Sequence, residues 1–397
     1  MRIAELHWAF PPTIGGVETH LATLGPGLIR RGHEVSLLTG QPGGLPAHDV
    51  FEGMSIERCP YLDLNRMTPE AFVREKSRVE DAIHQFLSDV NPDVIHVHNW
   101  HYFSEIPLEA VLRWREDHPV ALVLTAHNTW HDDLFQKLAE YGDQYDRIIA
   151  VSQYTLDDMA EWGYRAEKMR VVHHGVTAEW LNPAVRPQHP RPDVQGRPII
   201  FHPARLSLAK GSLVVVEAFR RVREVIPDAM LLLAGTGPIV DWGSVQHREI
   251  EMINDRIRHY GLTEAVDIRP YSWPEIAGVY DAASVVVYPS IFAEPFGIVV
   301  IEAMARGRPV VITRTGGMPE IITHEQDGWI VDPNDADQLA DALIQLLRHR
   351  DWAEALGQRA RERVKTSFTA EQMVERTEDV LNQAREVKVS HDQPVAS

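Results

Sequence analysis

Two glutamates, Glu294 and Glu302, lie eight positions apart in the apolar segment YPSIFAEPFGIVVIEAMARGRPVV. The residue pattern predicts a buried strand that ends at Pro289, a loop that carries Glu294, and a helix that Gly297 opens. The first free amides of such a helix and the positive end of its dipole form a binding site for a phosphate or diphosphate. Gly297 would let the backbone approach that anion closely.

Glu302 would lie a little over one turn inside this helix, about 6–8 Å along the axis from its first amides. That offset suits a carboxylate that accepts hydrogen bonds from a ribose diol, and Glu294 could bind a sugar hydroxyl on the other side of the phosphates. Taken alone, each glutamate is better explained as a solvated charge. Residues 298–301 around Glu302 are all apolar, however, so this carboxylate needs a partner.

Two cations, Arg205 and Lys210, stand in PARLSLAKG, after the strand expected to open the second half of the chain. Cleavage of a sugar–phosphate bond releases negative charge onto phosphate oxygens, and fixed cations in a low-dielectric cleft stabilise that charge. Lysine is rare in this chain, which uses arginine for most of its positive charge, so background usage does not explain Lys210. The alternative is a pair of solvated surface cations.

Glycines and histidines follow other predicted strands. Gly15 and Gly16 lie between the first strand and its helix, outside the pattern G-x-G-x-x-G, so a nicotinamide site is not supported. His127 ends the apolar strand of VLTAHNTWHDD. His96 and His98 share a strand face and could chelate a metal, but we see no carboxylate or third histidine at ligand spacing. We expect these two side chains to be packing or acceptor-side groups.

A group of aromatic side chains and an acidic pair complete the candidates. The aromatic group follows strands and could form a wall for an acceptor, although interior packing explains it equally well; it comprises Trp100, His101, Tyr102 and Trp130. Asp335 and Asp337 could hold a divalent metal. Because they follow Pro-Asn at a helix start, helix capping and complementarity to the helix dipole explain them better, and we expect no catalytic metal.

Short β-branched or Leu-rich runs alternate with longer amphipathic runs along both halves of the chain. This alternation predicts an α/β fold with parallel sheets wrapped by helices. A proline-rich stretch, LNPAVRPQHPRPDVQGRP, interrupts it and places a domain boundary. The expected division is an N-terminal acceptor-binding domain, a linker, a second doubly wound domain, a helix packing back on the first domain, and a disordered tail, at residues 1–185, 186–197, 198–368, 369–389 and 390–397.

Charge and cysteine content exclude several classes of protein. The 397 residues carry a formal charge of −18, which disfavours nucleic acids and anionic membranes as partners. Cys59 is the only cysteine, so an intrachain disulfide framework is impossible and a reducing cytoplasm is the expected location. The N-terminus shows no signal-peptide pattern, and membrane association is expected to be peripheral at most.

The stretch from Glu294 to Glu302 resembles the E-x7-E signature of retaining GT-B glycosyltransferases. Its surroundings, EPFGIVVIEAMARGRPVVITRTGGMPEII, resemble glycosyltransferase family 4, and PARLSLAKG is similar to the G-R-L-x-x-x-K-G motif of that family, with Ala204 at the usual glycine. The resemblance extends from Gly15 through the final helix. It implies two Rossmann-like doubly wound domains that face each other across a cleft, with nucleotide-sugar binding in the second.

The resemblance also implies roles for individual residues. Arg205 and Lys210 would neutralise the donor diphosphate, and His127 would hydrogen-bond the transferred sugar near its reacting carbon. The implied catalytic residues are His127, Arg205, Lys210 and Glu294; the implied donor-binding residues are Gly15, Gly16, Gly235, Tyr271, Phe296, Gly297, Ile298 and Glu302. A glycine is common where Pro270 or Tyr271 stands, which leaves the nucleobase open, and His174 replaces a common asparagine.

The implied reaction is transfer of a hexose or N-acetylhexosamine from a UDP- or GDP-sugar to a hydroxyl of a small molecule or oligosaccharide, with retention at the anomeric carbon. No residue stands out as a dedicated nucleophile, so front-face displacement without a metal cofactor is expected. Two alternatives stay open: a nucleotide-sugar epimerase of the same architecture, and a regulator that binds nucleotide sugars without turnover. The sequence does not indicate an oligomeric state.

Overall fold

The computed structural model describes residues 1–13, 15–64, 67–101, 104–182, 196–235, 244–271 and 273–392. The chain forms two compact units: Met1–His174 with the chain from Ala370 onward, and Gly175–Thr369. The expected first domain reached residue 185, whereas the second unit already begins at Gly175. Most of the expected linker, residues 186–195, lies outside the described residues.

The first unit contains an eight-stranded sheet in the order β3-β4-β2-β1-β5-β6-β7-β8. All neighbouring strands are parallel except the antiparallel pair β3 and β4. The strands are β1 (Arg2–Leu6), β2 (Glu34–Gly40), β3 (His48–Phe51), β4 (Met54–Cys59), β5 (Val94–His98), β6 (Ala121–Ala126), β7 (Arg147–Ala150) and β8 (Met169–Val171).

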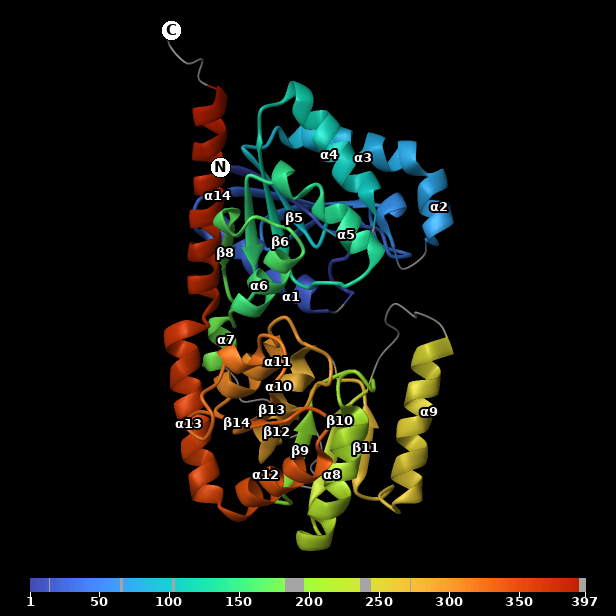
Figure 1. Ribbon diagram of the computed structural model, residues 1–397, viewed down its shortest axis with the longest axis vertical. Helices are drawn as coiled ribbons and strands as arrows, with labels where there is room; N and C mark the ends of the chain where they lie inside the picture. The colour runs from blue at the N-terminus through green and yellow to red at the C-terminus, as the bar shows by residue number, and fades with distance from the viewer. Residues whose placement is uncertain are drawn as a thin grey trace. The chain divides into compact units, whose positions relative to one another are not determined.

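Helices cover both faces of this sheet, as expected for strands that are apolar on both sides. They are α1 (Gly16–Arg30), α2 (Pro69–Arg74), α3 (Lys76–Val90), α4 (Glu105–Asp117), α5 (Asp133–Ala139), α6 (Gln153–Glu161) and α14 (Ala370–Asp392), with 3-10 turns at Pro60–Leu62, Gly142–Gln144 and Ala166–Lys168. The last helix, α14, contacts α1, β6 and β7 (Figure 1). A disordered tail was expected from Ser390, but α14 continues to Asp392, and residues 393–397 lie outside the described residues.

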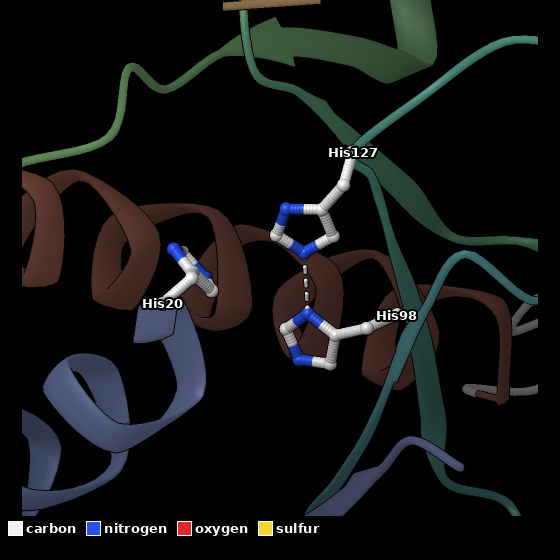
Figure 2. Close-up of side chains that lie close together, drawn as sticks. All are labelled: His20, His98 and His127. Atoms are coloured by element: carbon white, nitrogen blue, oxygen red, sulfur yellow. Dashed lines mark hydrogen bonds between the residues drawn. The ribbon is translucent and has the colours of Figure 1, made fainter. Parts of the chain in front are cut away.

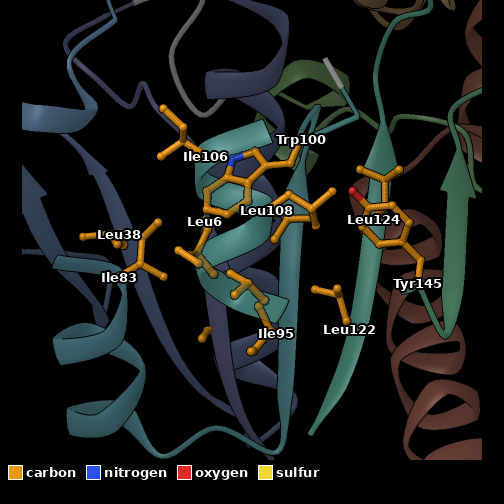
Figure 3. Close-up of a cluster of buried hydrophobic side chains, with 14 of the residues drawn as sticks. Leu6, Leu38, Ile83, Ile95, Trp100, Ile106, Leu108, Leu122, Leu124 and Tyr145 are labelled. Atoms are coloured by element: carbon orange, nitrogen blue, oxygen red, sulfur yellow. The ribbon is translucent and has the colours of Figure 1, made fainter. Parts of the chain in front are cut away.

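The core of the first unit is divided by the sheet into two hydrophobic clusters. On one face, side chains of the strands, such as Leu6 and Ile95, pack against Ile83 of α3 and Leu108 of α4 (Figure 3). On the other face, Leu24 of α1 belongs to the cluster that includes several side chains of α14. Burial of these side chains fixes the strands, and therefore the loops at their carboxyl ends.

The second unit contains a six-stranded parallel sheet in the order β11-β10-β9-β12-β13-β14. Its strands are β9 (Ile199–His202), β10 (Met230–Ala234), β11 (Val266–Arg269), β12 (Val285–Tyr288), β13 (Val310–Thr313) and β14 (Trp329–Val331). Its helices are α7 (Ala178–Leu181), α8 (Ser212–Val225), α9 (Ser244–His259), α10 (Trp273–Ala282), α11 (Ile298–Ala305), α12 (Ala336–Arg348) and α13 (Arg350–Ser367), with a 3-10 turn at Met318–Glu320.

The strand order reverses once in each sheet, between β1 and β5 in the first unit and between β9 and β12 in the second. Open parallel sheets bind ligands outside the carboxyl ends of the strands at such a reversal. Ligand-binding residues are therefore expected in the loops that follow these four strands. Among the helices of the described residues, none is both long and apolar enough to cross a membrane.

Candidate functional site

In the second unit, the loops after β9 and β12 bring Lys210 and Glu294 into contact. Lys210 Nζ forms an ion pair with Glu294 Oε1, with side-chain exposures of 20% for the lysine and 8% for the glutamate. Ser290 Oγ lies 3.1 Å from the same carboxylate oxygen. Burial, followed by the charge of Glu294, raises the pKa of the Tyr288 hydroxyl. Both charged residues are predicted site residues, but their pairing does not follow from the sequence.

Two glycines allow these loops to approach each other. Gly211 has a φ of 76°, and a Cβ at this position would lie 2.0 Å from the carbonyl oxygen of Pro289. Gly316 has a φ of 55°, and a Cβ there would lie 2.1 Å from the carbonyl oxygen of Glu294. The amide of Gly317 donates a 2.8 Å hydrogen bond to that same oxygen. The backbone of Glu294 is therefore held by a turn that a side chain at residue 316 would disrupt.

Glu302 is buried in α11, and its partner is Tyr280 of α10. The Tyr280 hydroxyl donates a 2.8 Å hydrogen bond to Glu302 Oε2. Burial raises the pKa of Glu302 to about 7, and the hydrogen bond from Tyr280 opposes that rise. The helix begins after Gly297, whose φ is 105°. The structure therefore supplies the partner that the apolar surroundings of Glu302 required, although the sequence did not identify it.

The other residues expected in the second unit occupy loops and helix starts around the same sheet. Arg205 is exposed in the loop after β9. The amide of Gly235 donates a 2.8 Å hydrogen bond to the carbonyl of Arg269. Phe296 is buried and Ile298 is the first residue of α11. The Tyr271 ring packs edge-on against Phe201, with ring centroids 6.1 Å apart.

In the first unit, the reversal between β1 and β5 carries the expected glycines and a group of buried histidines. Gly15 caps α1 in an extended conformation and Gly16 is the first residue of that helix. His98 Nδ1 lies 2.9 Å from His127 Nε2, and Figure 2 shows this contact beside His20 of α1. His20 Nδ1 in turn lies 3.0 Å from His174 Nδ1.

Burial keeps these histidines uncharged near neutral pH. It lowers the pKa of both His98 and His174 to about 3, with further lowering from the charges of neighbouring histidines. For the same two reasons, in the same order, the pKa values of His20 and His127 lie well below the ordinary value. The cluster therefore presents neutral imidazoles, each with one donor and one acceptor nitrogen.

Glu5 of β1 lies beneath these histidines and corrects the sequence analysis, which found no carboxylate or third histidine near His96 and His98. Parallel pairing sets Glu5 opposite His96. Glu5 Oε2 lies 2.7 Å from His98 Nε2 and 3.0 Å from His96 Nδ1. Burial alone would raise the pKa of Glu5, but the charge and hydrogen bonds of His96 and His98 lower it to about 2.

Among the described residues, two groups have ligand atoms close enough to hold a metal ion: His20, His98 and His127, and Glu5, His96 and His98. Imidazole nitrogens suit zinc and other transition metals. Of the acidic pair considered in the sequence, Asp335 caps α12 by accepting a 2.8 Å hydrogen bond from the amide of Gln338, as expected.

The expected acceptor residues differ in their surroundings. Trp100 is buried in the hydrophobic cluster, and His101 Nε2 lies 2.7 Å from the carbonyl oxygen of Asn128, with its ring 5.5 Å from that of Trp130. Tyr102 lies outside the described residues. An apolar pocket nearby is lined by Trp8, Leu62, Leu64, Phe72, Trp100, Ser104 and Pro107. Trp100 thus combines interior packing with a place in a pocket wall.

The sequences of related proteins match nearly the whole chain. An uncharacterized glycosyltransferase of Methanocaldococcus jannaschii, MJ1607, is 27% identical, with 98% of this chain and 99% of the relative covered. The glycogen synthase of Mycobacterium tuberculosis is 26% identical, with 93% and 91% covered.

Solved structures show the same fold. Sucrose-phosphate synthase from Thermosynechococcus elongatus superposes with a TM-score of 0.84 at 23% identity, over 97% of this chain and 99% of that chain. Anabaena Alr3699/HepE in complex with UDP-glucose superposes with a TM-score of 0.75 at 19% identity, over 96% and 99%.

Each half of the chain matches a family model. The model described as Glycosyltransferase Family 4 matches residues 14–180, and the model described as Glycosyl transferases group 1 matches residues 186–363. Both models, together with the two-sheet architecture and the relatives above, assign the same class. This chain belongs to the GT-B glycosyltransferases of family 4.

Proposed function

We propose that this glycosyltransferase moves a hexose or N-acetylhexosamine from a UDP- or GDP-sugar to a hydroxyl of a small molecule or oligosaccharide, with retention and without a metal cofactor. The observation that carries the proposal is the ion pair of Lys210 and Glu294, beside the start of α11, at the reversal point of the second sheet. A lysine ammonium has three donors, so Lys210 can contact Glu294 and an anionic phosphate together.

The donor nucleotide is supported by neighbours of the same fold. Anabaena Alr3699/HepE was solved with UDP and with UDP-glucose. A UDP-sugar is therefore the first donor to test, and a GDP-sugar the second. The single cysteine and the nucleotide-sugar substrate favour a cytoplasmic reaction.

The proposed chemistry is front-face displacement. The acceptor oxygen forms a bond to the anomeric carbon on the face from which the phosphate departs. The bond between the anomeric carbon and the phosphate oxygen breaks, and the hydroxyl proton passes to that departing oxygen. Lys210 and Arg205 stabilise the charge on the diphosphate, and the amides at the start of α11 add to this. Glu294 orients the donor sugar, Glu302 binds the ribose, and His127 contacts the transferred sugar.

Nucleotide release from a panel of UDP- and GDP-sugars, measured with and without a panel of sugar and polyol acceptors, tests the proposal. We expect one donor to release its nucleotide faster by at least tenfold when an acceptor is present. Epimerisation of the donor without any acceptor would contradict transfer, and so would tight donor binding with no nucleotide release over hours.

A further inference from the structure

A continuous chain of short contacts runs from a buried carboxylate to the sugar-binding histidine of the proposed site. Glu5 Oε2 lies 2.7 Å from His98 Nε2, and His98 Nδ1 lies 2.9 Å from His127 Nε2. All three side chains are buried. We propose that Glu5 and His98 are positioning residues that hold the proton of His127 on Nε2, so that Nδ1 accepts a hydrogen bond from a hydroxyl of the donor sugar.

The direction of the hydrogen bonds from Glu5 to His127 follows from the charge of the Glu5 carboxylate. Both His96 Nδ1 and His98 Nε2 lie within hydrogen-bond distance of Glu5 Oε2. Against the effect of burial, the charge and hydrogen bonds of His96 and His98 lower the pKa of Glu5 to about 2, so at neutral pH this group is an ionised carboxylate, which can only accept from both nitrogens. His98 therefore carries its proton on Nε2 and, being neutral, accepts at Nδ1. His127 must then donate from Nε2, which leaves its Nδ1 unprotonated.

The Nδ1 atom of His127 is buried and has no hydrogen bond within the described part of the chain. In Figure 2 this nitrogen points away from His98. The other titratable groups around His127 are further histidines, His20 of α1, His174 and His7. A buried acceptor without a donor is costly, so the donor must come from water in the free protein and from a ligand in the complex.

Two further contacts hold the backbone at His127. Its backbone amide donates a 2.7 Å hydrogen bond to Asn99 Oδ1, and the amide of Asn99 donates a 3.0 Å hydrogen bond to the Thr125 carbonyl. His127 as a whole is 8% exposed, so part of the residue reaches the surface although its Nδ1 atom is itself buried. A carboxylate that orients a histidine which then acts on a substrate is the arrangement of hydrolase triads, here lengthened by one imidazole.

The consequence is a specificity rule, and it rests on the proposed function. An acceptor-only nitrogen recognises a group that donates a hydrogen, such as a neutral sugar hydroxyl. It repels a carboxylate or any other group that can only accept. The site is thus suited to a neutral hexose with a free hydroxyl at the contacted carbon, and unsuited to a uronic acid or a deoxy sugar at that carbon.

Metal binding is the competing reading of the same atoms, since His20, His98 and His127 could hold an ion. A metal ion bound by His98 and His127 would be coordinated by the same two nitrogens, His98 Nδ1 and His127 Nε2, that the proposed hydrogen bond joins. His98 Nε2 is already bonded to Glu5, so its Nδ1 would be the metal ligand. The two interpretations therefore place different things between His98 Nδ1 and His127 Nε2: a hydrogen-bonded proton in one case and a metal ion in the other.

Histidine ¹⁵N NMR of the full chain tests the proton positions without any substrate. His84 and His118 serve as internal references, because His84 Nε2 and His118 Nδ1 each face a backbone carbonyl oxygen and must each carry the proton there. We expect His98 and His127 to show the Nε2–H pattern of His84, with each signal assigned by its loss in the corresponding glutamine variant. An Nδ1–H pattern or a charged ring at His127 would overturn the proposal.

Variants test the series of hydrogen bonds from Glu5 through His98 to His127 in the same spectra. Glu5→Gln replaces an obligate acceptor by an amide that can also donate, so we expect His127 to become a mixture of both tautomers. His84→Gln is the matched control and should leave His127 unchanged. An unaltered His127 pattern in Glu5→Gln would overturn the role of Glu5. Stoichiometric zinc binding that is lost in both His98→Gln and His127→Gln would likewise overturn the proposal in favour of a metal site.

Kinetics then separate the specificity rule from the proposed function. With UDP-glucose and its monodeoxy analogues, one deoxy analogue should lose about 10- to 100-fold in kcat/KM with the parent protein. In Glu5→Gln that loss should shrink at least threefold, while His84→Gln should retain it. Equal losses in all three proteins would overturn the rule. Absence of transfer from every donor in the panel of UDP- and GDP-sugars would reject the proposed function and leave the NMR result to decide the proton positions.

Discussion

Lys210 and Glu294 form their ion pair across 84 positions of sequence, from two loops that follow adjacent parallel strands. The pair lies where the strand order of the second sheet reverses, and both side chains are largely removed from solvent. A cation held in this way keeps a fixed position before any ligand arrives. Preorganised charge of this kind stabilises a departing phosphate without reorganisation during the reaction.

Replacing Lys210 tests this assignment. We expect Lys210→Met to lower kcat by about 10²- to 10³-fold, because the departing diphosphate loses a fixed cation. Steady-state kinetics measure the effect, and circular dichroism checks the fold. Lys137→Met is a matched control, since Lys137 forms an ion pair with Glu105 on the surface of the first unit. A kcat that falls less than threefold in Lys210→Met would show that Lys210 does not act on the leaving group.

Glu302 should make the stability of the protein depend on pH. Because its pKa is raised from 4.5 to about 7, its contribution to the free energy of unfolding is greatest below pH 4.5 and falls as pH rises to about 7. The total fall is about 3 kcal/mol. Chemical denaturation of the wild type and Glu302→Gln from pH 4.5 to 8 measures it, and the variant should gain stability relative to the wild type over this range.

Tyr280→Phe refines that test. Loss of the hydroxyl donor raises the pKa of Glu302 further, so the fall in stability should extend to higher pH than in the wild type. Tyr145→Phe is the control, because Tyr145 is also buried but its hydroxyl has no hydrogen bond within the described residues. Identical pH profiles for all three proteins would mean that Glu302 does not titrate in this range.

Gly316 should be intolerant of any side chain. Gly316→Ala places a Cβ 2.1 Å from the Glu294 carbonyl oxygen, so the loop must move and transfer should fall by at least tenfold. Gly261→Ala is the control: Gly261 has a similar positive φ of 65°, but no atom lies within 4 Å of the added Cβ. That variant should lose about 1 kcal/mol of stability from backbone strain and keep full activity. Equal activity in both variants would contradict the role of the turn in holding Glu294.

The sequence predicts the parallel α/β architecture well because strands buried on both faces read as continuous apolar runs. β6, with the sequence ALVLTA, is fully buried and was expected at this position. The edge pair β3 and β4 was not predicted, since β3 is exposed along most of its length and lacks an apolar pattern. The prolines indicate an irregular segment between the domains, whereas contacts in space, which the sequence pattern does not reveal, place the start of the second unit at Gly175.

Local motifs in the sequence indicated part of the candidate site, but not the contacts that depend on strand register and helix packing. Glu294, Glu302 and Lys210 stand in short recognisable segments. Glu5 and Tyr280 do not, because their partners are set by strand pairing and helix packing between distant residues. One signal for Glu5 was present: it is an acidic residue that follows Ile3 and Ala4 and precedes Leu6 in strand β1. A charge at such a position needs a buried partner.

Transfer by the protein after exhaustive treatment with EDTA tests the central claim most directly. With the preferred donor and acceptor, we expect an unchanged rate and a product whose anomeric configuration matches that of the donor, as read from its anomeric proton coupling. Loss of activity in EDTA that returns with Mg²⁺ or Mn²⁺, or a product of inverted configuration, would contradict the claim that protein groups alone stabilise the departing diphosphate on the front face.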